Sequence, residues 1–99
     1  MIVRVRFLVE AADDLQEGFL FYEKRDPGVG RRLIDEVSSC IERIVEAPQQ
    51  WERTSKNCRR CRVHSFPYDV VYQSREHEIV IVAVVQLNRR PGYWRKRIK

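Results

Sequence analysis

The sequence has no long apolar run and no segment with the pattern of a targeting signal. No stretch approaches the roughly 20 apolar residues of a membrane helix. The opening segment carries Arg4 and Arg6 among its apolar residues, unlike a signal peptide. We therefore expect a cytoplasmic chain with no membrane contact. Its 99 residues suffice for a single domain, residues 1–99, with a two-layer core.

The sequence contains only three cysteines, Cys40, Cys58 and Cys61, without the spacing of a disulfide framework. Cys58 and Cys61 form the segment CRRC, a spacing found in zinc sites and in thioredoxin-like redox motifs. A zinc site usually needs a second ligand pair, and a redox motif usually follows a strand and opens a helix. Neither context is present. We expect an incidental thiol pair on a strand, with no metal and no cofactor.

The familiar catalytic patterns are also missing. The sequence has no Gly-rich phosphate loop, no GxSxG and no HExxH, and it has two histidines, neither beside a plausible nucleophile. Paired carboxylates at Asp13–Asp14 and Asp35–Glu36 lie on predicted helices, where a solvated face is the expected role. The acidic residues are therefore predicted to belong to the scaffold.

Charge is present, and it is divided between the two halves of the chain. Residues 1–52 carry 7 basic and 11 acidic side chains, whereas residues 53–99 carry 12 basic and 3 acidic ones. A positive electrostatic field over part of a small domain attracts a polyanion or an acidic protein segment. The division therefore points to the second half as the binding half.

Hydrophobic periodicity predicts an order of elements. Alternation at Val3, Val5 and Phe7 predicts a strand. Apolar residues at three- and four-residue spacing predict two helices, one from Ala11 to the segment RDPGVG and one from Leu33 to Ala47. The short connection between them indicates an antiparallel hairpin.

A loop at Pro48–Asn57, with Trp51 tucked under the helices, precedes three predicted strands, at about Arg59–Phe66, Tyr68–Gln73 and Glu78–Val85. The fold class is α+β: an N-terminal strand, an antiparallel helix hairpin and a three-stranded antiparallel meander, in one antiparallel sheet with the helices on one face. The last strand is apolar on both faces, so it is expected at the centre. The tail, which holds a Pro–Gly bend, can fold back across the open face.

The candidate site is basic. Such a set of residues suits RNA chemistry, because guanidinium groups can hold a scissile phosphate and an aromatic ring can stack on a nucleobase. Cleavage of RNA by its own 2′-hydroxyl needs a general acid, a general base and electrostatic support, but no metal. Tyr93 could stack or handle a proton, with Arg60, Arg89 or Arg90 supplying the field. The expected RNA contacts are Lys56, Arg59, Arg62, Arg95, Lys96 and Arg97. In the alternative interpretation, Tyr93 and Trp94 pin the tail to the core while the arginines stay solvated.

Four segments resemble the RelE/ParE superfamily, the toxins of type II toxin–antitoxin modules, which include plasmid stabilisation proteins. They are AADDLQEGFLFYE at 11–23, ERIVEAPQQW at 42–51, RCRVHSFPYDVVYQ at 60–73 and IVIVAVVQLNRRPGYWRKR at 79–97. FPY with Tyr72, followed by RRPGYW after the last strand, is the most specific combination. The superfamily fold, two helices on an antiparallel sheet, is similar to the one predicted here.

The resemblance implies a growth-inhibiting toxin neutralised by a cognate antitoxin. Some members cleave messenger RNA on the ribosome, and others, closer to ParE, poison DNA gyrase. The positions matching the ribonucleases' functional residues are Lys56, Arg60, Arg89 or Arg90, and Tyr93. Many relatives have a histidine about where Gln86 stands, so this chain lacks a possible proton carrier there. A non-enzymatic nucleic-acid-binding module and an inactive toxin relic remain open as alternatives.

Overall fold

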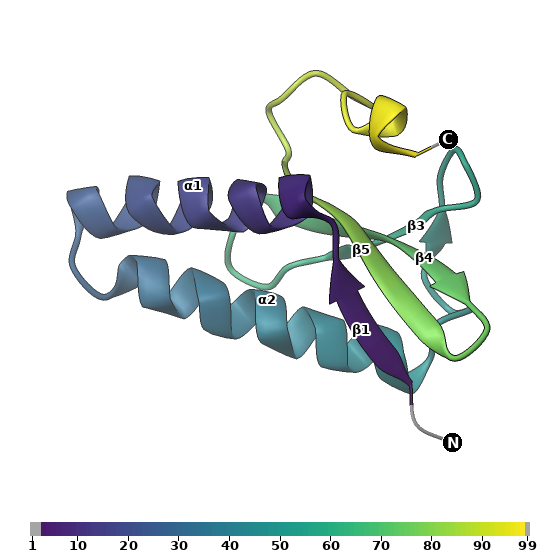
Figure 1. The fold of residues 1–99 in the computed structure, drawn as a ribbon. Coiled ribbons are helices and arrows are strands. Elements are labelled where there is room, and N and C mark those ends of the chain that lie inside the picture. The colour runs from purple at the N-terminus through teal and green to yellow at the C-terminus, as the bar shows by residue number, and fades with distance from the viewer. Residues whose placement is uncertain (1–2, 99) are drawn as a thin grey trace.

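The computed structural model describes residues 3–98, which form two helices packed on a five-stranded sheet (Figure 1). The elements are β1 (Arg4–Phe7), α1 (Val9–Arg25), α2 (Val29–Glu46), β2 (Glu52–Arg53), β3 (Arg59–Arg62), β4 (Tyr68–Arg75), β5 (Glu78–Gln86) and a 3-10 turn, η1 (Arg95–Arg97). The α+β class, the helix hairpin and the three-stranded meander are confirmed. Within residues 3–98, neither α1 nor α2 has the length and apolar character that crossing a bilayer demands.

The strand order in the sheet is β1-β5-β4-β3-β2, and it corrects two expectations. Strand β1 runs parallel to β5, so the sheet is mixed and not entirely antiparallel. Parallel neighbours require a long connection, and here it contains the helix hairpin followed by β2, β3 and β4. Strand β5 is an interior strand between β1 and β4, and β4 holds the middle position that was predicted for β5.

The region around β3 departs from the predicted boundaries. Strand β3 ends at Arg62 and not at Phe66, because the chain turns there: Ser65 has a φ of 68°, and the Tyr68 N–H donates to the Phe66 carbonyl at 2.8 Å. The predicted loop 48–57 contains the short strand β2, which pairs with β3. Trp51 packs against the core and its indole N–H donates to the Arg43 carbonyl at 3.4 Å, which confirms its predicted place under the helices.

The connection between the helices is tighter than predicted, and α2 begins at Val29, four residues before Leu33. Gly28 takes a φ of 97°, and the Glu23 carboxylate of α1 accepts hydrogen bonds from the N–H groups of Gly28 and Gly30 at 3.0 and 2.9 Å. A Cβ on Gly30 would lie 2.5 Å from the Phe19 carbonyl oxygen. Glycine at position 30 therefore lets the two helices approach closely, and Glu23 supplies the cap that α2 lacks in its own sequence.

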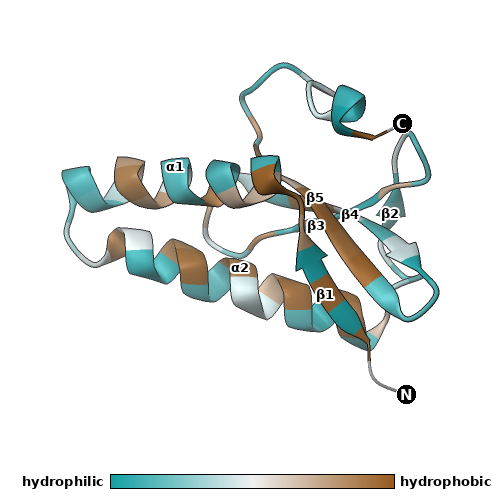
Figure 2. Ribbon diagram, viewed as in Figure 1, coloured by the Kyte–Doolittle hydropathy of each residue, from teal (hydrophilic) through white to brown (hydrophobic). Residues whose placement is uncertain are grey.

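The two faces of the sheet are buried by different parts of the chain. We call one the helix face: Val70, Tyr72, Ile79 and Ile81 are buried there with side chains of α1 and α2. Figure 2 shows hydrophobic (brown) segments along α2 and β5. We call the other the tail face, where Val71, Val80, Val82 and Ala83 are buried with Trp94. The predicted shared face of Tyr68, Val70 and Tyr72 is confirmed.

A β-bulge in β5 places two successive residues of this strand on the tail face. Val71 of β4 is opposite Ala83, but the next residue, Tyr72, is opposite Ile81, so Val82 has no partner in β4. The bulge shifts the alternation by one residue. As a result Val82 and Ala83 both face the tail, and Val84 returns to the helix face.

Candidate functional site

The C-terminal tail, residues 87–98, lies across the tail face, as the sequence predicted. The Leu87 N–H donates to the Pro67 carbonyl at 2.8 Å where the chain leaves β5. Gly92 takes a φ of 74° at the predicted bend, and Trp94, only 4% exposed, is the main apolar anchor of the tail. The tail therefore presents its basic residues from a fixed backbone that runs along the sheet.

A pocket of about 200 Å³ opens between the tail and the sheet, and we call it the basic pocket. Its lining includes Arg60 of β3 with Arg89 and Arg95 of the tail, which are three of the predicted site residues. The Arg60 guanidinium pairs with the Glu52 carboxylate at 2.9 Å, and Arg95 Nε donates to Ser55 Oγ at 2.8 Å. Folding thus gathers guanidinium groups from two distant segments, and two of the three already have protein partners.

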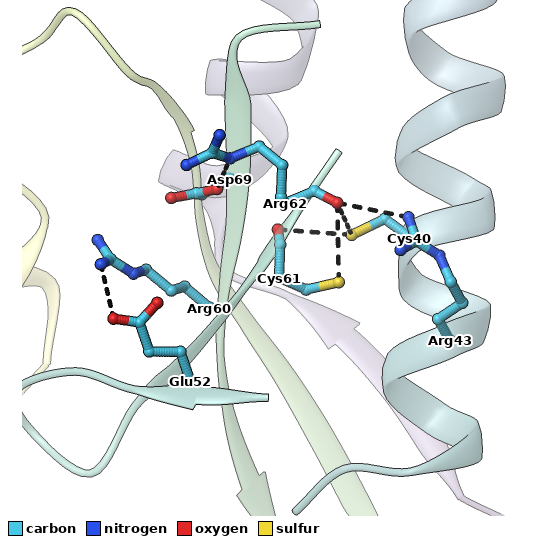
Figure 3. Close-up of polar contacts among 7 residues, drawn as sticks. All are labelled: Cys40, Arg43, Glu52, Arg60, Cys61, Arg62 and Asp69. Carbon is cyan, nitrogen blue, oxygen red and sulfur yellow. Dashed lines mark hydrogen bonds and ion pairs between the residues drawn. The ribbon is translucent and has the colours of Figure 1, made fainter. Parts of the chain in front are cut away.

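Carboxylates also lie within or beside this pocket. Asp69, buried on β4, lines the pocket and accepts a hydrogen bond from Arg62 Nε at 2.7 Å, as Figure 3 shows beside the Arg60–Glu52 pair. The hydrogen bond from Arg60 lowers the pKa of Glu52, so this carboxylate is charged at neutral pH. The paired carboxylates weaken the attraction of the pocket for a phosphate.

Tyr93 borders a second cavity, a groove of about 410 Å³ between α1 and the tail, which we call the α1 groove. The Arg89 guanidinium lies 4.8 Å from the ring centroid of Tyr93. Burial raises the pKa of Tyr93, so its phenol is neutral at physiological pH. Gln86 and Glu17 also line the groove.

The structure separates the other predicted site residues. Arg90 and Lys96 are exposed on the outer side of the tail, near Tyr93, and Lys56 is exposed in the loop before β3. Arg59 points away from the tail: its guanidinium donates to the Trp51 carbonyl at 2.8 Å and to Gln49 Oε1 at 3.1 Å. Arg97 is largely buried. The basic residues therefore do not form a single cluster.

Asp14 is a site residue that the sequence analysis missed. It was expected on a solvated helix face, but its side chain is 9% exposed and pairs with Arg97 at 2.7 Å. The expectation was wrong because Asp14 lies on the inner face of α1, three residues after the buried Ala11 and four before the buried Gly18. This position relative to the apolar stripe was the available signal.

The CRRC cysteines face opposite sides of the sheet. Cys58 is buried on the tail face and Cys61 on the helix face, where its thiol and that of Cys40 both lie near the Arg62 carbonyl (Figure 3). Burial raises the pKa of Cys58 to about 11, so the thiol stays protonated. Among residues 3–98, no three His, Cys, Asp or Glu side chains come together as ligands for a metal ion.

The fold and its basic tail can be compared with known proteins. A solved structure titled "Chromosomal ParDE TA system from P. aeruginosa" superposes with a TM-score of 0.77 over 88% of this chain and 98% of the other. The two sequences are 13% identical, so this likeness shows a shared fold. A search of curated protein sequences found no significant match. The sequence model of the family described as "ParE toxin of type II toxin-antitoxin system, parDE" matches residues 5–91. Because this match covers most of the chain, the protein belongs to the ParE toxin family of type II toxin–antitoxin systems.

Proposed function

We propose that this toxin inhibits bacterial growth by poisoning DNA gyrase, without cutting RNA, and that a cognate antitoxin neutralises it. The observation that carries the proposal is that none of the described residues lining the groove beside Tyr93 is a histidine, and that Gln86 lines it instead. The Tyr93 phenol holds its proton, the Gln86 amide neither accepts nor donates one at neutral pH, and Asp14 in the same groove is held in an ion pair with Arg97. Cleavage by a 2′-hydroxyl needs both a base and an acid.

The charges around Tyr93 support the same conclusion. Asp14 and Glu17 of α1 line the groove on which Tyr93 opens, together with Lys24 and Arg89, so a scissile phosphate bound there would meet carboxylates as well as cations. The guanidinium groups of Arg60, which was predicted to supply the field, and of Arg97, a predicted RNA contact, are already paired with carboxylates. A toxin that binds a protein target needs the shape and charge of this surface but no proton transfer.

The family match favours the same target. The matching family is the ParE toxin of parDE modules, and the superfamily members close to ParE act on gyrase. A cognate antitoxin fits the exposed basic tail, which an extended acidic or amphipathic segment can cover while it folds. Arg90 and Lys96, both exposed, offer the charge that such a segment would meet.

The test is controlled expression in a bacterial host, with growth, DNA synthesis and protein synthesis followed by pulse labelling. We expect DNA synthesis to fall first. We also expect Arg89→Ala and Tyr93→Ala to relieve the block. The matched control is Arg31→Ala, which removes an exposed arginine paired with Asp35 on α2, far along the chain from the tail; it should inhibit growth as the unaltered chain does.

Other outcomes separate the alternatives. An earlier fall in protein synthesis, with cleaved messenger RNA, would contradict the proposal and indicate a ribosome-dependent ribonuclease. Unimpaired growth despite soluble expression would indicate an inactive relic or a nucleic-acid-binding module. A binding module would then show salt-dependent affinity for RNA or DNA without cleavage.

A further inference from the structure

Asp14 and Arg97 satisfy two main-chain groups of β5 that lie beyond the end of β1. Strand β1 pairs with β5 only as far as Ile81, so Val82 and Val84 lie beyond its end. The Val84 N–H donates to Asp14 Oδ2 at 3.0 Å, and the Val82 carbonyl accepts a hydrogen bond from an Arg97 Nη at 3.1 Å. One acidic and one basic side chain thus complete the strand where its neighbour stops.

Asp14 and Arg97 also bind each other, 83 residues apart in the sequence. Two Arg97 nitrogens donate to the two Asp14 carboxylate oxygens at 2.7 and 3.1 Å. The side chain of Arg97 is 13% exposed and that of Asp14 is 9% exposed. Among the ion pairs of residues 3–98, this is the pair in which both partners are largely buried. The pair therefore joins three elements, α1, the β5 bulge and η1.

The same guanidinium also contacts the ring of Tyr93. Arg97 Cζ lies 5.3 Å from the Tyr93 ring centroid, and Arg89 Cζ lies 4.8 Å from it, so two arginines contact one ring. Tyr93 and Arg89 form part of the tail-side lining of the α1 groove, to which Asp14 itself contributes from the helix. Loss of the ion pair would release the ring from one of its two guanidinium contacts.

We infer that Asp14 and Arg97 are a positioning pair that locks the tail, and with it Arg89 and Tyr93, into the geometry that the toxin uses against its target. The inference rests on the proposed function, in which the tail contacts the target. Breaking one partner leaves the other as an unpaired buried charge, and the tail can remove this charge from the interior by opening. The helices and the rest of the sheet can remain folded because Trp94 and the tail lie outside the helix-face core.

The first test measures tail opening on the purified chain, independently of toxicity. Trypsin cleavage after Arg89 and Arg95 is followed by mass spectrometry under native conditions. We expect Asp14→Asn and Arg97→Gln each to raise the cleavage rate by roughly tenfold or more. The double variant should be no faster than the faster single variant, because the two side chains act as one unit.

The matched control is Arg6→Gln, which breaks the exposed Arg6–Glu78 pair between β1 and β5. It should leave the cleavage rate unchanged. Arg97→Lys keeps the positive charge but loses the planar guanidinium, so it should raise the trypsin cleavage rate less than Arg97→Gln does. It also provides a folded variant if Arg97→Gln does not fold. An unchanged rate in any folded Asp14 or Arg97 variant would overturn the inference.

The second test is growth inhibition by the same variants, at matched soluble expression. We expect Asp14→Asn and Arg97→Gln to lose inhibition and Arg97→Lys to keep part of it. Full inhibition by a variant whose tail opens freely would overturn the positioning role while leaving the proposed function intact. If the unaltered chain does not inhibit growth, the proposed function fails, and trypsin cleavage still decides whether the pair locks the tail.

Discussion

The helix face and the tail face of the same sheet are built from different chemistry. On the helix face, Leu33, Val37 and Ile44 of α2 pack on Tyr72 and Ile81 in a continuous apolar layer. On the tail face a smaller apolar cluster around Trp94 lies beside charged residues that are held in ion pairs. A sheet face covered by two helices can exclude water over its whole width, whereas one covered by a thin segment of chain cannot. We therefore expect most of the stability to come from the helix face, and we propose the tail face as the site of the activity.

Leu33→Ala should have the largest effect on stability. Leu33 is fully buried between the helices and the sheet, and a buried Leu→Ala change typically lowers the free energy of unfolding by about 2–5 kcal/mol. Urea denaturation followed by circular dichroism measures this change. A loss well under 1 kcal/mol would mean that the helix face is not the main source of stability.

Trp94→Ala sharpens the comparison. A core Trp→Ala change typically costs about 3–5 kcal/mol, but the tail can detach without exposing the helix face, so we expect a smaller loss than for Leu33→Ala. Growth inhibition, in contrast, should disappear. Denaturation and a growth assay at matched expression measure the two effects, and a loss of stability above that of Leu33→Ala would contradict the division of roles between the faces.

Alkaline pH should weaken the helix face through its buried phenols. Burial raises the pKa of Tyr68 and of Tyr72 to about 12, from an ordinary value of 10.0. Between these values the unfolded chain releases protons that the folded chain holds, so the free energy of unfolding should fall as the pH rises from 10 toward 12. Ionisation would also remove the proton that the Tyr72 hydroxyl donates to the Pro48 carbonyl at 2.6 Å.

Denaturation at several pH values, with tyrosinate absorbance as a monitor, measures this fall in stability. Tyr72→Phe removes one of the groups that titrate in this range, so its stability should vary less with pH over the same range. An equal slope for Tyr72→Phe and the unaltered chain would contradict this assignment.

Glu23→Gln should have the smallest effect. The Glu23 carboxylate caps the N-terminus of α2, and a charge at that end of a helix contributes about 0.3–1 kcal/mol. We expect a loss in this range, measured by denaturation, with growth inhibition intact. Glu42→Gln, a change at an exposed position on α2, is the control and should alter stability less than Glu23→Gln.

The sequence predicted those parts of the fold that follow from local periodicity. Helical spacing gave α1 and α2, alternation gave β1 and β4, and the Pro–Gly bend indicated the path of the tail. The parallel pairing of β1, the short strand β2 and the bulge at Val82 depend on which segments meet in space. No local pattern carries that information.

The candidate site was predicted less well than the fold, because residue type does not reveal pairing. Arg60, Arg89 and Arg95 do meet in one pocket, as expected of a basic site. Arg97 and Arg62 were grouped with them by charge, yet each is bound to a carboxylate, Asp14 or Asp69, from another element. The buried ion pair between α1 and the tail cannot be predicted without the three-dimensional positions of both segments.

The most direct test of the central claim uses purified toxin, purified gyrase and supercoiled plasmid. If the tail face acts on gyrase, linear plasmid should accumulate after detergent and protease treatment with the unaltered chain. It should not accumulate with Tyr93→Ala, and Arg31→Ala should behave as the unaltered chain does. No linear DNA with any variant, together with cleavage of messenger RNA in a translating extract, would contradict the claim.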